Sequence, residues 1–230
     1  PNLKFIGRGG VGMDNIDVAY AKEKGLTVKN TPASSSQSVA ELAIAHLFSL
    51  SRGVYDANRQ MPVNGLEKFK DLKKKYGKGI ELRGKTIGII GFGRIGQSLA
   101  SYALGLGMNV IFHDKFVDKA EITISINNKN ISVSLNGSSF EELLSKSDFI
   151  SLHVPKQADG NAVIGSEEFS KMKDGVIVIN LARGGVIDEA ELIKALDSGK
   201  VEGAGLDVFE NEPTPSQHLL KHHKISLTPY

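Results

Sequence analysis

Gly91, Gly93 and Gly96, spaced as G-x-G-x-x-G, are the residues whose type and spacing point most directly to chemistry. The first glycine permits a tight turn, the second lets the backbone approach a pyrophosphate, and the third lets a helix pack closely on a strand. A helix that begins in this turn directs its first N–H groups and the positive end of its dipole at the phosphates. The amides of Arg94 and Ile95 lie in that first turn, so the spacing predicts a dinucleotide site.

Such a site needs a buried strand before the glycines and a second strand that ends in an acid. Residues 86–90 form a short, apolar, β-branched run typical of a strand buried on both faces. A helix is expected over residues 95–104 and a second strand over residues 109–112. Asp114 follows, where a carboxylate would accept hydrogen bonds from ribose hydroxyls and repel a 2′-phosphate. We therefore expect NAD as the cofactor. A lysine directly after the acid leaves NADP open, and an ordinary βαβ turn with a chance acid is the alternative.

Strands alternate with helices along most of the chain, which predicts an α/β fold with a doubly wound parallel sheet of the Rossmann type. Further strands are expected at residues 3–6, 26–29, 148–154, 176–180, 203–208 and 225–228. The first two strands, with a helix over residues 14–24, form a βαβ unit ahead of the glycine motif and should belong to another sheet. We therefore expect residues 1–36 to be the C-terminal part of the first segment of a second domain, and residues 37–230 to be the dinucleotide-binding domain.

The stretch after the Pro- and Ser-rich residues 31–37 has the composition of a buried helix. Ser38 and Glu41 match a capping box that would open a helix running to about residue 52. Apolar residues cover nearly its whole circumference, so this helix must be buried on several sides. An interior position and a subunit interface both satisfy that requirement.

Three later helices are also expected to begin at polar residues. Ser139 and Glu142 match a second capping box, and Ser166 is expected to cap a short helix over residues 167–172. Asp188 precedes a helical segment that ends at a glycine, and it is better explained as an N-cap than as a catalytic acid.

Two stretches interrupt the alternation. Residues 121–135 alternate apolar and polar side chains around an Asn-rich turn, which predicts an antiparallel hairpin inserted at the edge of the domain. Residues 67–78 carry six lysines, and because such a run is usually a solvated helix face, we expect that rather than a nucleic-acid site.

The bulk composition excludes several classes of protein. The chain has 230 residues, a net charge of +2 and no cysteine, so disulfides and thiolate metal sites are absent, and we expect no metal and no nucleic-acid or membrane partner. No signal peptide or apolar run of spanning length is evident, and we expect a cytoplasmic protein. Because the chain begins at Pro1 without an initiator Met and stops directly after a strand-like run, we expect a fragment lacking both ends.

Six separate patches, in order, resemble the D-isomer-specific 2-hydroxyacid dehydrogenases, and most closely the D-3-phosphoglycerate dehydrogenases. The patches are Gly7-Arg-Gly-Gly-Val-Gly-Met-Asp-Asn-Ile-Asp17, Ser38-Val-Ala-Glu41, Gly91-Phe-Gly-Arg-Ile-Gly96, Leu152-His-Val-Pro155, Asn180-Leu-Ala-Arg-Gly-Gly185 and Leu206-Asp-Val-Phe-Glu-Asn-Glu-Pro213. The resemblance covers essentially the whole chain. It implies a smaller, flavodoxin-like substrate domain beside the NAD-binding Rossmann domain.

The resemblance also implies catalytic roles. In these enzymes a 2-hydroxy acid loses hydride from its C2 atom to nicotinamide while a base takes the hydroxyl proton. Arg183 would clamp the substrate carboxylate and polarise the C2 oxygen, a two-point grip that suits a planar guanidinium. Glu212 would orient the catalytic histidine, and Asp207 would hydrogen-bond the nicotinamide carboxamide.

Binding roles are implied for residues that follow other strands. The residues expected to line the adenine pocket are His153, Val154 and Pro155. His153 would lie far from the nicotinamide, so we expect it to be structural rather than catalytic. In the first βαβ unit, the N–H groups of Val11 and Gly12 would hold the substrate carboxylate, and Arg8 would contact a 3-phosphate.

The final residues depart from the family pattern. The chain reads Thr228-Pro229-Tyr230 where the family usually has a histidine, its general acid/base, after Thr-Pro. The reference pKa is about 6.5 for imidazole and about 10 for the tyrosine phenol, and proton transfer is most efficient near the working pH. We therefore expect Tyr230 to be a poor base and any surviving activity to be weak or to use a substitute group. Three histidines, His218, His222 and His223, precede this position.

The function that follows is NAD-dependent hydride transfer on a D-2-hydroxy acid. Oxidation of D-3-phosphoglycerate to 3-phosphohydroxypyruvate, a step of serine biosynthesis, is favoured because Arg8 offers a phosphate contact. The alternatives are a reductase of the glyoxylate, hydroxypyruvate or D-lactate type, and a catalytically weak NAD(H)-binding sensor module. A homodimer or homotetramer is expected.

Overall fold

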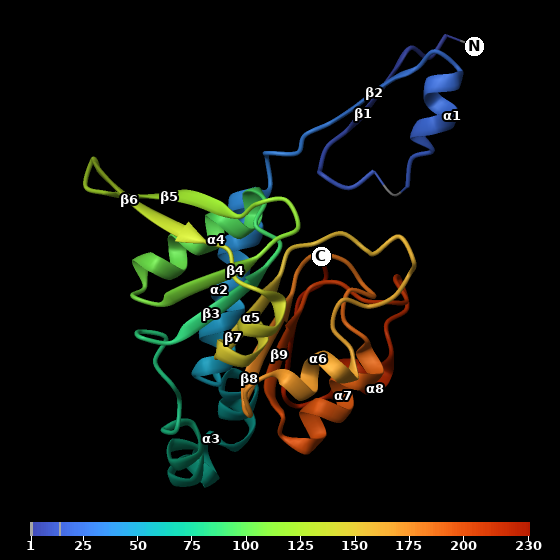
Figure 1. Cartoon of the computed structure of the whole chain (residues 1–230). Helices are drawn as coiled ribbons and strands as arrows, with labels where there is room; N and C mark the ends of the chain where they lie inside the picture. Colours follow the sequence, from blue (N-terminus) through green and yellow to red (C-terminus); the bar gives the residue numbers. More distant parts are fainter. Residues whose placement is uncertain (1, 14) are drawn as a thin grey trace.

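A six-stranded parallel sheet forms the centre of the computed structural model, which describes residues 2–13 and 15–230 (Figure 1). Its strand order is β10-β9-β8-β7-β3-β4, and each adjacent pair is parallel. The strands are β3 (Thr86–Ile90), β4 (Asn109–His113), β7 (Phe149–Leu152), β8 (Val176–Asn180), β9 (Val201–Leu206) and β10 (Ile225–Leu227). The predicted α/β fold with a parallel sheet is confirmed.

Helices cover both faces of this sheet, as the alternation of side chains in β8 shows. Val176 and Val178 belong to one hydrophobic cluster, whereas Ile177 and Ile179 belong to the other. The first cluster includes residues of α5 (Phe140–Lys146), α6 (Ser166–Lys171) and α7 (Glu189–Ser198). The second includes residues of α2 (Ser36–Ser51) and α4 (Arg94–Gly105). The sheet is therefore doubly wound, with a buried face on each side.

The chain reverses its direction of progress across the sheet at β3. It runs from β3 outward to the edge strand β4, then returns to β7 on the other side of β3 and continues through β8 and β9 to β10. In open α/β sheets, such a reversal opens a crevice at the carboxyl ends of the strands, and ligands bind there. The carboxyl ends of β3 and β7 flank this point.

The N-terminal residues form a separate small unit. Two parallel strands, β1 (Phe5–Arg8) and β2 (Thr27–Asn30), pair with each other and flank α1 (Val18–Glu23). In Figure 1 this unit projects from the main body on a single connecting segment. The helix begins later than predicted, since Asp17 is its N-cap and accepts a hydrogen bond from the Tyr20 N–H. Its expected start at Asp14 lies outside the described residues.

The predicted capping box at the start of α2 is wrong. The helix begins at Ser36, which places Ser38 inside its first turn, and the N-cap residue Ser35 makes no side-chain hydrogen bond there. The backbone carbonyl of Ser35 already accepts from the Val39 N–H, so the helix starts without the expected Ser-Glu pair. Ala40 and Leu47 are buried against the rest of the core.

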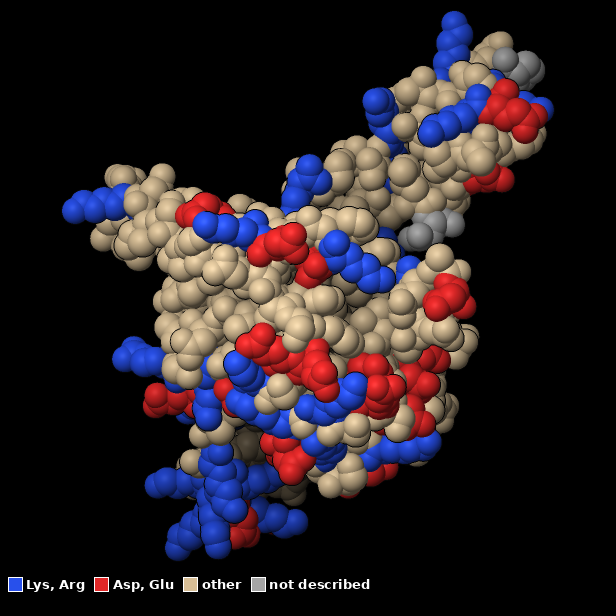
Figure 2. Space-filling model, viewed as in Figure 1, with Lys and Arg blue, Asp and Glu red and all other residues tan. Residues whose placement is uncertain are grey.

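A long helix, α3 (Val54–Tyr76), contains the lysine-rich stretch, and the sequence analysis predicted only its second half. Its dihedral angles become non-helical at Lys68, so it consists of two arms. Asp56 in the first arm accepts hydrogen bonds from Lys75 and Tyr76 in the second, which holds the arms together. Figure 2 shows lysines gathered over α3, at the end of the body opposite the N-terminal unit.

The inserted hairpin consists of β5 (Lys119–Ile126) and β6 (Lys129–Asn136), which pair in antiparallel register. Its turn is shorter than expected, because only Asn127 and Asn128 separate the strands, with φ of 46° and 61°. Positive φ at both central residues is the conformation of a two-residue type I′ turn. Ile122 is buried and joins the hairpin to the core.

The remaining helix starts were predicted with mixed success. Ser139 accepts from the Glu142 N–H, and Asp188 accepts from the Glu191 N–H, as an N-cap should. The cap expected at Ser166 is wrong, because Ser166 is the first helical residue and Gly165 is the N-cap. The Glu168 carboxylate there accepts from the Gly165 N–H. The last helix is α8 (Gln217–Lys221).

Candidate active site

The parallel strands bring the predicted site residues of the main body to one edge of the sheet. Because every strand of the central sheet points the same way, the loops that leave β3, β4, β7, β8, β9 and β10 meet at its carboxyl edge. The predicted residues that follow these strands are Gly91, Asp114, His153, Arg183, Asp207 and Tyr230. Residues far apart in sequence are thereby collected at one edge of the sheet.

The glycine-rich loop between β3 and α4 has the tight geometry that its spacing predicts. Gly91 has a φ of +90°, and a Cβ on this residue would lie 2.5 Å from the backbone oxygen of His153. A Cβ on Gly96 would overlap the backbone oxygen of Gly91, so only glycine lets α4 pack this closely on the loop. A Cβ on Gly93, in contrast, would have no atom within 4 Å and would project into open space.

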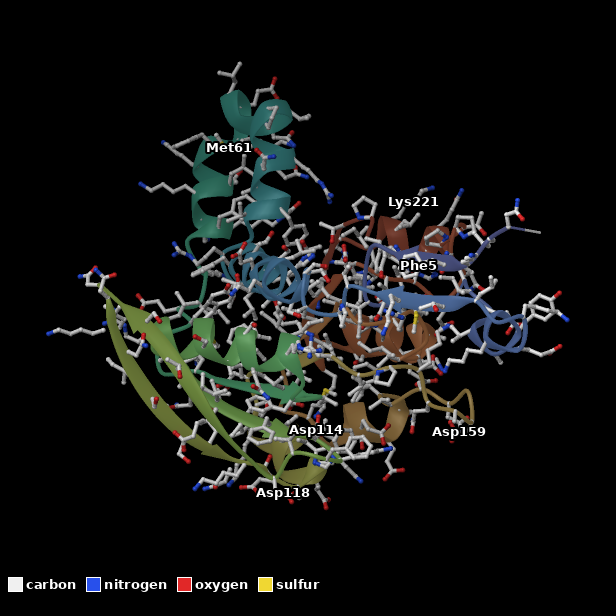
Figure 3. All side chains as sticks on the ribbon, turned by 90° about the horizontal axis from the view of Figure 1, so that it is seen from above. Phe5, Met61, Asp114, Asp118, Asp159 and Lys221 are labelled. Carbon is white, nitrogen blue, oxygen red and sulfur yellow. The ribbon has the colours of Figure 1, made fainter. Side chains whose placement is uncertain are left out.

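Asp114 holds the same loop, which the sequence did not reveal. Its Oδ2 atom accepts a hydrogen bond of 2.6 Å from the Phe92 N–H. Its Oδ1 atom accepts from the N–H groups of Phe116 and Val117 at 2.8 and 3.2 Å. Figure 3 shows Asp114 and the nearby Asp118 close to the start of the hairpin. A carboxylate has about four acceptor positions, so capacity for a ribose hydroxyl remains after these three bonds.

These features together fit a dinucleotide. Arg94 and Ile95 are the first residues of α4, so their N–H groups belong to the helix end that faces the loop. The open space at Gly93 is where a pyrophosphate would approach the backbone. The side chain of Phe92 points the other way and stacks on Phe112 in the core, with ring centroids 3.7 Å apart. The loop therefore offers amides outward while an aromatic side chain anchors it inward.

The segment after β7 lies against the glycine-rich loop. A Cβ on Gly91 would lie 2.7 Å from Cγ1 of Val154 as well as close to the backbone of His153, and Pro155 follows as an exposed residue. The His153 Nε2 atom is 2.9 Å from the Ser151 hydroxyl, and its buried Nδ1 atom has no partner among the described residues. Burial lowers the pKa of His153 to about 4, so the ring is neutral near pH 7 and unsuited to act as a general base there.

Arg183 lies in a turn that Asn180 closes at the end of β8. The Asn180 side chain donates to the Arg183 backbone oxygen and accepts from the Ala182 N–H, both at 3.0 Å. A Cβ on Gly184 would overlap the backbone oxygen of Phe209, so this turn lies directly against the loop after β9. The half-buried Arg183 guanidinium donates to the Ala182 carbonyl at 2.7 Å.

Asp207 joins the ends of β9 and β10. It is buried, with 6% exposure, and its Oδ1 atom accepts from the Thr228 hydroxyl at 2.5 Å and from the Tyr230 N–H at 3.1 Å. Behind it lies His46 of α2, whose ring is hydrogen-bonded to Ser226 and Thr228. His46 was not predicted as a site residue; in the sequence it is a lone histidine within a largely apolar helix.

Glu212 and Tyr230 line one groove of about 480 Å³. The Glu212 carboxylate accepts from the Phe209 N–H at 2.9 Å, and the Tyr230 side chain is 71% exposed. None of His218, His222 and His223 is among the residues that line this groove. His222 contacts Asp197 at the C-terminal end of α7, and the His223 backbone oxygen accepts from the Tyr55 hydroxyl. The groove is lined by Asp207, Phe209, Glu212, Pro213, Pro215, Leu220, Leu227, Thr228, Pro229 and Tyr230.

The predicted substrate residues of the N-terminal unit make contacts within that unit. The Arg8 guanidinium donates to the backbone oxygens of Gly9 and Gly12, at 2.6 and 3.2 Å. The Val11 backbone oxygen accepts from the Asn30 side chain. Arg8 therefore folds over its own glycine-rich loop.

Two features are absent from residues 2–13 and 15–230, the part of the chain that the structure describes. In this part of the chain, no cluster of three or more His, Cys, Asp or Glu is arranged to hold a metal ion. In the same part, none of the helices combines the length and the apolar character needed to cross a bilayer.

Comparison with known proteins gives matches over the whole chain. The family model described as D-isomer specific 2-hydroxyacid dehydrogenase, NAD binding domain, matches residues 44–230. The chain is 44% identical to a D-3-phosphoglycerate dehydrogenase of Archaeoglobus fulgidus, over all of this chain and 41% of that protein. It is also 44% identical to a hydroxypyruvate reductase of Thermotoga maritima, over all of this chain and 70% of the relative.

A solved structure gives the same result in three dimensions. The crystal structure of a glyoxylate reductase from Paecilomyes thermophila superposes with a TM-score of 0.79 and 37% sequence identity. The match covers 98% of this chain and 64% of the glyoxylate reductase. The chain thus spans less than half of the phosphoglycerate dehydrogenase and about two thirds of either reductase.

Proposed function

Because the chain belongs to the D-isomer-specific 2-hydroxyacid dehydrogenase family, we propose that it binds NAD at its glycine-rich loop and serves hydride transfer with a D-2-hydroxy acid. The observation that carries this proposal is the shared carboxyl edge of the sheet. There the open backbone at Gly93 and the acid Asp114 follow β3 and β4, and Arg183 and Asp207 follow β8 and β9 along the same edge.

In this proposal the chain's own residues bind and orient. NAD, when bound, supplies the hydride acceptor. Arg183 grips the substrate carboxylate and draws electron density from the C2 oxygen, a role for which a fixed, planar cation is suited. Its turn is held by Asn180, and Gly184 sets it against the loop after β9, so its position is determined by backbone packing. Asp207 accepts from the nicotinamide carboxamide.

Proton transfer is the weak element of the proposed reaction. Glu212 and Tyr230 line the same groove, so the family's general acid/base histidine and the glutamate that orients it are represented here by a phenol and a carboxylate. A phenol hydroxyl can donate a hydrogen bond to the C2 oxygen. As a base for oxidation, a phenol is less well matched to neutral pH than the imidazole that it replaces.

The substrate is proposed to be D-3-phosphoglycerate, with oxidation to 3-phosphohydroxypyruvate in serine biosynthesis. Arg8 supports this choice, because an arginine on a glycine-rich loop can pair with a phosphate once its contacts to the loop carbonyls are exchanged. The hydroxypyruvate and glyoxylate reductases among the relatives support the alternative of a smaller, unphosphorylated 2-oxo acid, and a D-lactate type remains in the same class.

The proposed reaction is tested by measuring turnover of three candidate substrates, and by comparing this chain with the variant Tyr230→His. Turnover of 3-phosphoglycerate with NAD, and of hydroxypyruvate and glyoxylate with NADH, is measured from pH 7 to pH 10 for this chain and for any longer chain that contains it. We expect Tyr230→His to raise turnover at pH 7 by about two orders of magnitude, the usual contribution of a general acid/base. No gain in this variant would contradict the role assigned to position 230.

A catalytically weak NAD(H)-binding sensor is the second candidate. Tyr230 in place of histidine favours it, whereas the retained Arg183 and Glu212 favour the enzyme. Tight NADH binding without turnover on any of the three acids, in the parent chain and in Tyr230→His alike, would select the sensor.

We further propose that residues 1–36 belong to a substrate domain and residues 37–230 to the NAD-binding domain. The separate two-stranded sheet of the N-terminal unit supports this division, and so does the start of the family match at residue 44. Association as a homodimer or homotetramer is supported by large apolar side chains exposed on α2 and α3. These are Phe48, Val54, Met61, Val63, Leu66 and Phe69.

A further inference from the structure

A chain of hydrogen bonds runs from the core to the nicotinamide end of the proposed site. His46 of α2 is only 3% exposed, and its two ring nitrogens contact two hydroxyls of the last strand and its end. The Nδ1 atom is 3.0 Å from Ser226 Oγ, and the Nε2 atom is 3.1 Å from Thr228 Oγ1. Thr228 Oγ1 in turn contacts Oδ1 of Asp207. These groups come from α2, β9 and β10, which only the folded chain brings together.

The chemistry of the four side chains determines which group donates and which accepts in each of these hydrogen bonds. A carboxylate can only accept hydrogen bonds, so the Thr228 hydroxyl donates its one hydrogen to Asp207. The Thr228 oxygen must then accept from His46, which places a proton on Nε2. In a neutral ring Nδ1 is consequently an acceptor, and Ser226 donates to it. The sequence of donors is Ser226 to His46 to Thr228 to Asp207.

Burial keeps the imidazole neutral, as this arrangement requires. Burial lowers the pKa of His46, and the negative charge of Asp207 opposes this effect without reversing it. The ring also lies closely against β9. A Cβ on Gly205 would lie 2.9 Å from both Cβ and Cγ of His46, so glycine at this position allows the ring to occupy its place.

We propose that His46 is a positioning residue for the nicotinamide end of the cofactor: through Thr228 it fixes the orientation of the Asp207 carboxylate. The proposal rests on the proposed NAD-binding function. Both hydrogen bonds described for the Asp207 side chain, from Thr228 and from the Tyr230 N–H, end on Oδ1. The second oxygen is thereby directed to accept from an amide. Without the Thr228 bond, the carboxylate can rotate and that acceptor is no longer held in place.

The proposal is tested by comparing two ligands and two matched pairs of variants. NADH carries the nicotinamide carboxamide, and ADP-ribose has the same phosphates and adenosine without it. His46→Gln keeps an N–H donor near the place of Nε2, whereas the shorter His46→Asn does not reach Thr228. Thr228→Ser keeps the hydroxyl, and Thr228→Val removes it at nearly constant volume. Dissociation constants are measured by calorimetry on the 230-residue chain.

We expect His46→Asn and Thr228→Val each to weaken NADH binding by about tenfold, the typical effect of a lost hydrogen bond to a charged group. Binding of ADP-ribose should be unchanged in both variants, and His46→Gln and Thr228→Ser should retain most of the NADH affinity. Equal loss of both ligands would show a merely structural role and overturn the proposal, as would unchanged NADH binding. If the parent chain binds neither ligand, the proposed function itself fails, and the inference with it.

A spectroscopic measurement tests the hydrogen-bond chain independently of any ligand. Long-range ¹H–¹⁵N correlation NMR on the ligand-free chain should show His46 as the neutral tautomer protonated on Nε2 at pH 7. Thr228→Val removes the acceptor that selects this tautomer, so the Nε2–H form should lose its dominance there. A ring protonated on Nδ1 in the parent chain would reverse the deduced direction and overturn the proposal even if the variants were unstable.

Discussion

Two glycine-rich loops leave parallel strands in this molecule, and they are built differently. The loop after β3 leads at once into α4, which begins at Arg94, and two of its glycines allow close packing of backbone on backbone. The loop after β1 leads to α1 only at Val18. A Cβ on Gly9 in this first loop would touch nothing within 4 Å. Both loops are rich in glycine, but of these two only the loop after β3 has a helix N-terminus directed at its own turn.

The strands that precede the two loops differ in how deeply they are buried. Every residue of β3 from Ile87 to Ile90 is buried, whereas residues of β1 alternate between exposed and half-buried. A loop on a strand that is buried on both faces is held rigidly, and a rigid array of N–H groups binds an anion without a cost of ordering. Strand burial and the distance to the next helix, rather than glycines alone, therefore distinguish the turn proposed to bind the pyrophosphate from the loop after β1.

The largest expected effect is that of Gly96→Ala. The added methyl would overlap the Gly91 backbone oxygen, and backbone cannot move aside as a side chain would. We expect a loss of about 2–3 kcal/mol in the free energy of unfolding, a fall of roughly 5–10 °C in Tm, and loss of NADH binding. Thermal unfolding followed by circular dichroism checks the first two. The control is Gly9→Ala in the other loop, which should stay within about 0.5 kcal/mol; equal losses in both would erase the distinction.

Gly93→Ala should separate folding from binding. Its φ of −72° suits any residue, and its Cβ would meet no atom within 4 Å, so we expect Tm to be unchanged. The methyl would occupy the space that a pyrophosphate needs, and NADH affinity should fall by at least about tenfold. Calorimetry measures this, with Gly105→Ala at the far end of the same helix as the control. Undiminished affinity in Gly93→Ala would place the phosphates elsewhere.

In the main body, Asp148 forms hydrogen bonds at the amino end of β3. We expect these bonds to make the stability of the main body fall at acid pH. Asp148 accepts from the Thr86 N–H at 2.8 Å and from Lys173 at 3.0 Å. Burial alone would raise the pKa of Asp148, but these two hydrogen bonds outweigh it and lower the pKa. The stabilisation is therefore present above pH 4 and is lost as pH falls through the folded-state pKa. Asp148→Asn should cost about 1 kcal/mol at pH 7.

This pH dependence is measured by urea unfolding of the parent chain and Asp148→Asn between pH 7 and pH 3. The two stabilities should converge at the acid end, because the parent side chain becomes neutral there. A gap that stays constant with pH would show that the carboxylate's charge contributes nothing.

The smallest effect is expected for Arg8→Ala in the first loop. Among the residues that the structure describes, the guanidinium bonds to carbonyls of its own partly exposed turn, so its removal should change the free energy of unfolding by less than about 0.5 kcal/mol. NADH affinity should be unchanged, because this loop is assigned no phosphate of the cofactor. Weaker NADH binding in Arg8→Ala would show that the two loops act on the same ligand.

The loop after β3 could be predicted in detail from the sequence because its features depend on local sterics. Glycines at fixed offsets, a buried β-branched strand and an acid after the next strand each have one physical explanation, and the N-cap at Asp188 follows from the same local logic. The capping box expected at Ser38 failed because the N-cap of α2 is Ser35, three residues earlier, and a Ser-Glu pair inside a helix has the same spacing as one at its start.

The hydrogen bonds that link His46 through Thr228 to Asp207 could not be predicted from the sequence. His46 and Thr228 are 182 positions apart, and no periodicity relates a histidine in an apolar helix to a hydroxyl beyond a distant strand. Asp114 was assigned to the ribose but not to the Phe92 N–H, because that contact depends on how the loop returns over the strand end. Side-chain networks among different elements are set by tertiary packing, which the sequence pattern does not encode locally.

Calorimetric titration of NADH into the 230-residue chain and into Asp114→Ala tests the central claim most directly. We expect one saturable site in the parent chain and affinity at least about tenfold lower in the variant, because Asp114 accepts from the Phe92 N–H and is proposed to bind the ribose. Absence of binding in the parent chain, or equal affinity in the two proteins, would contradict it.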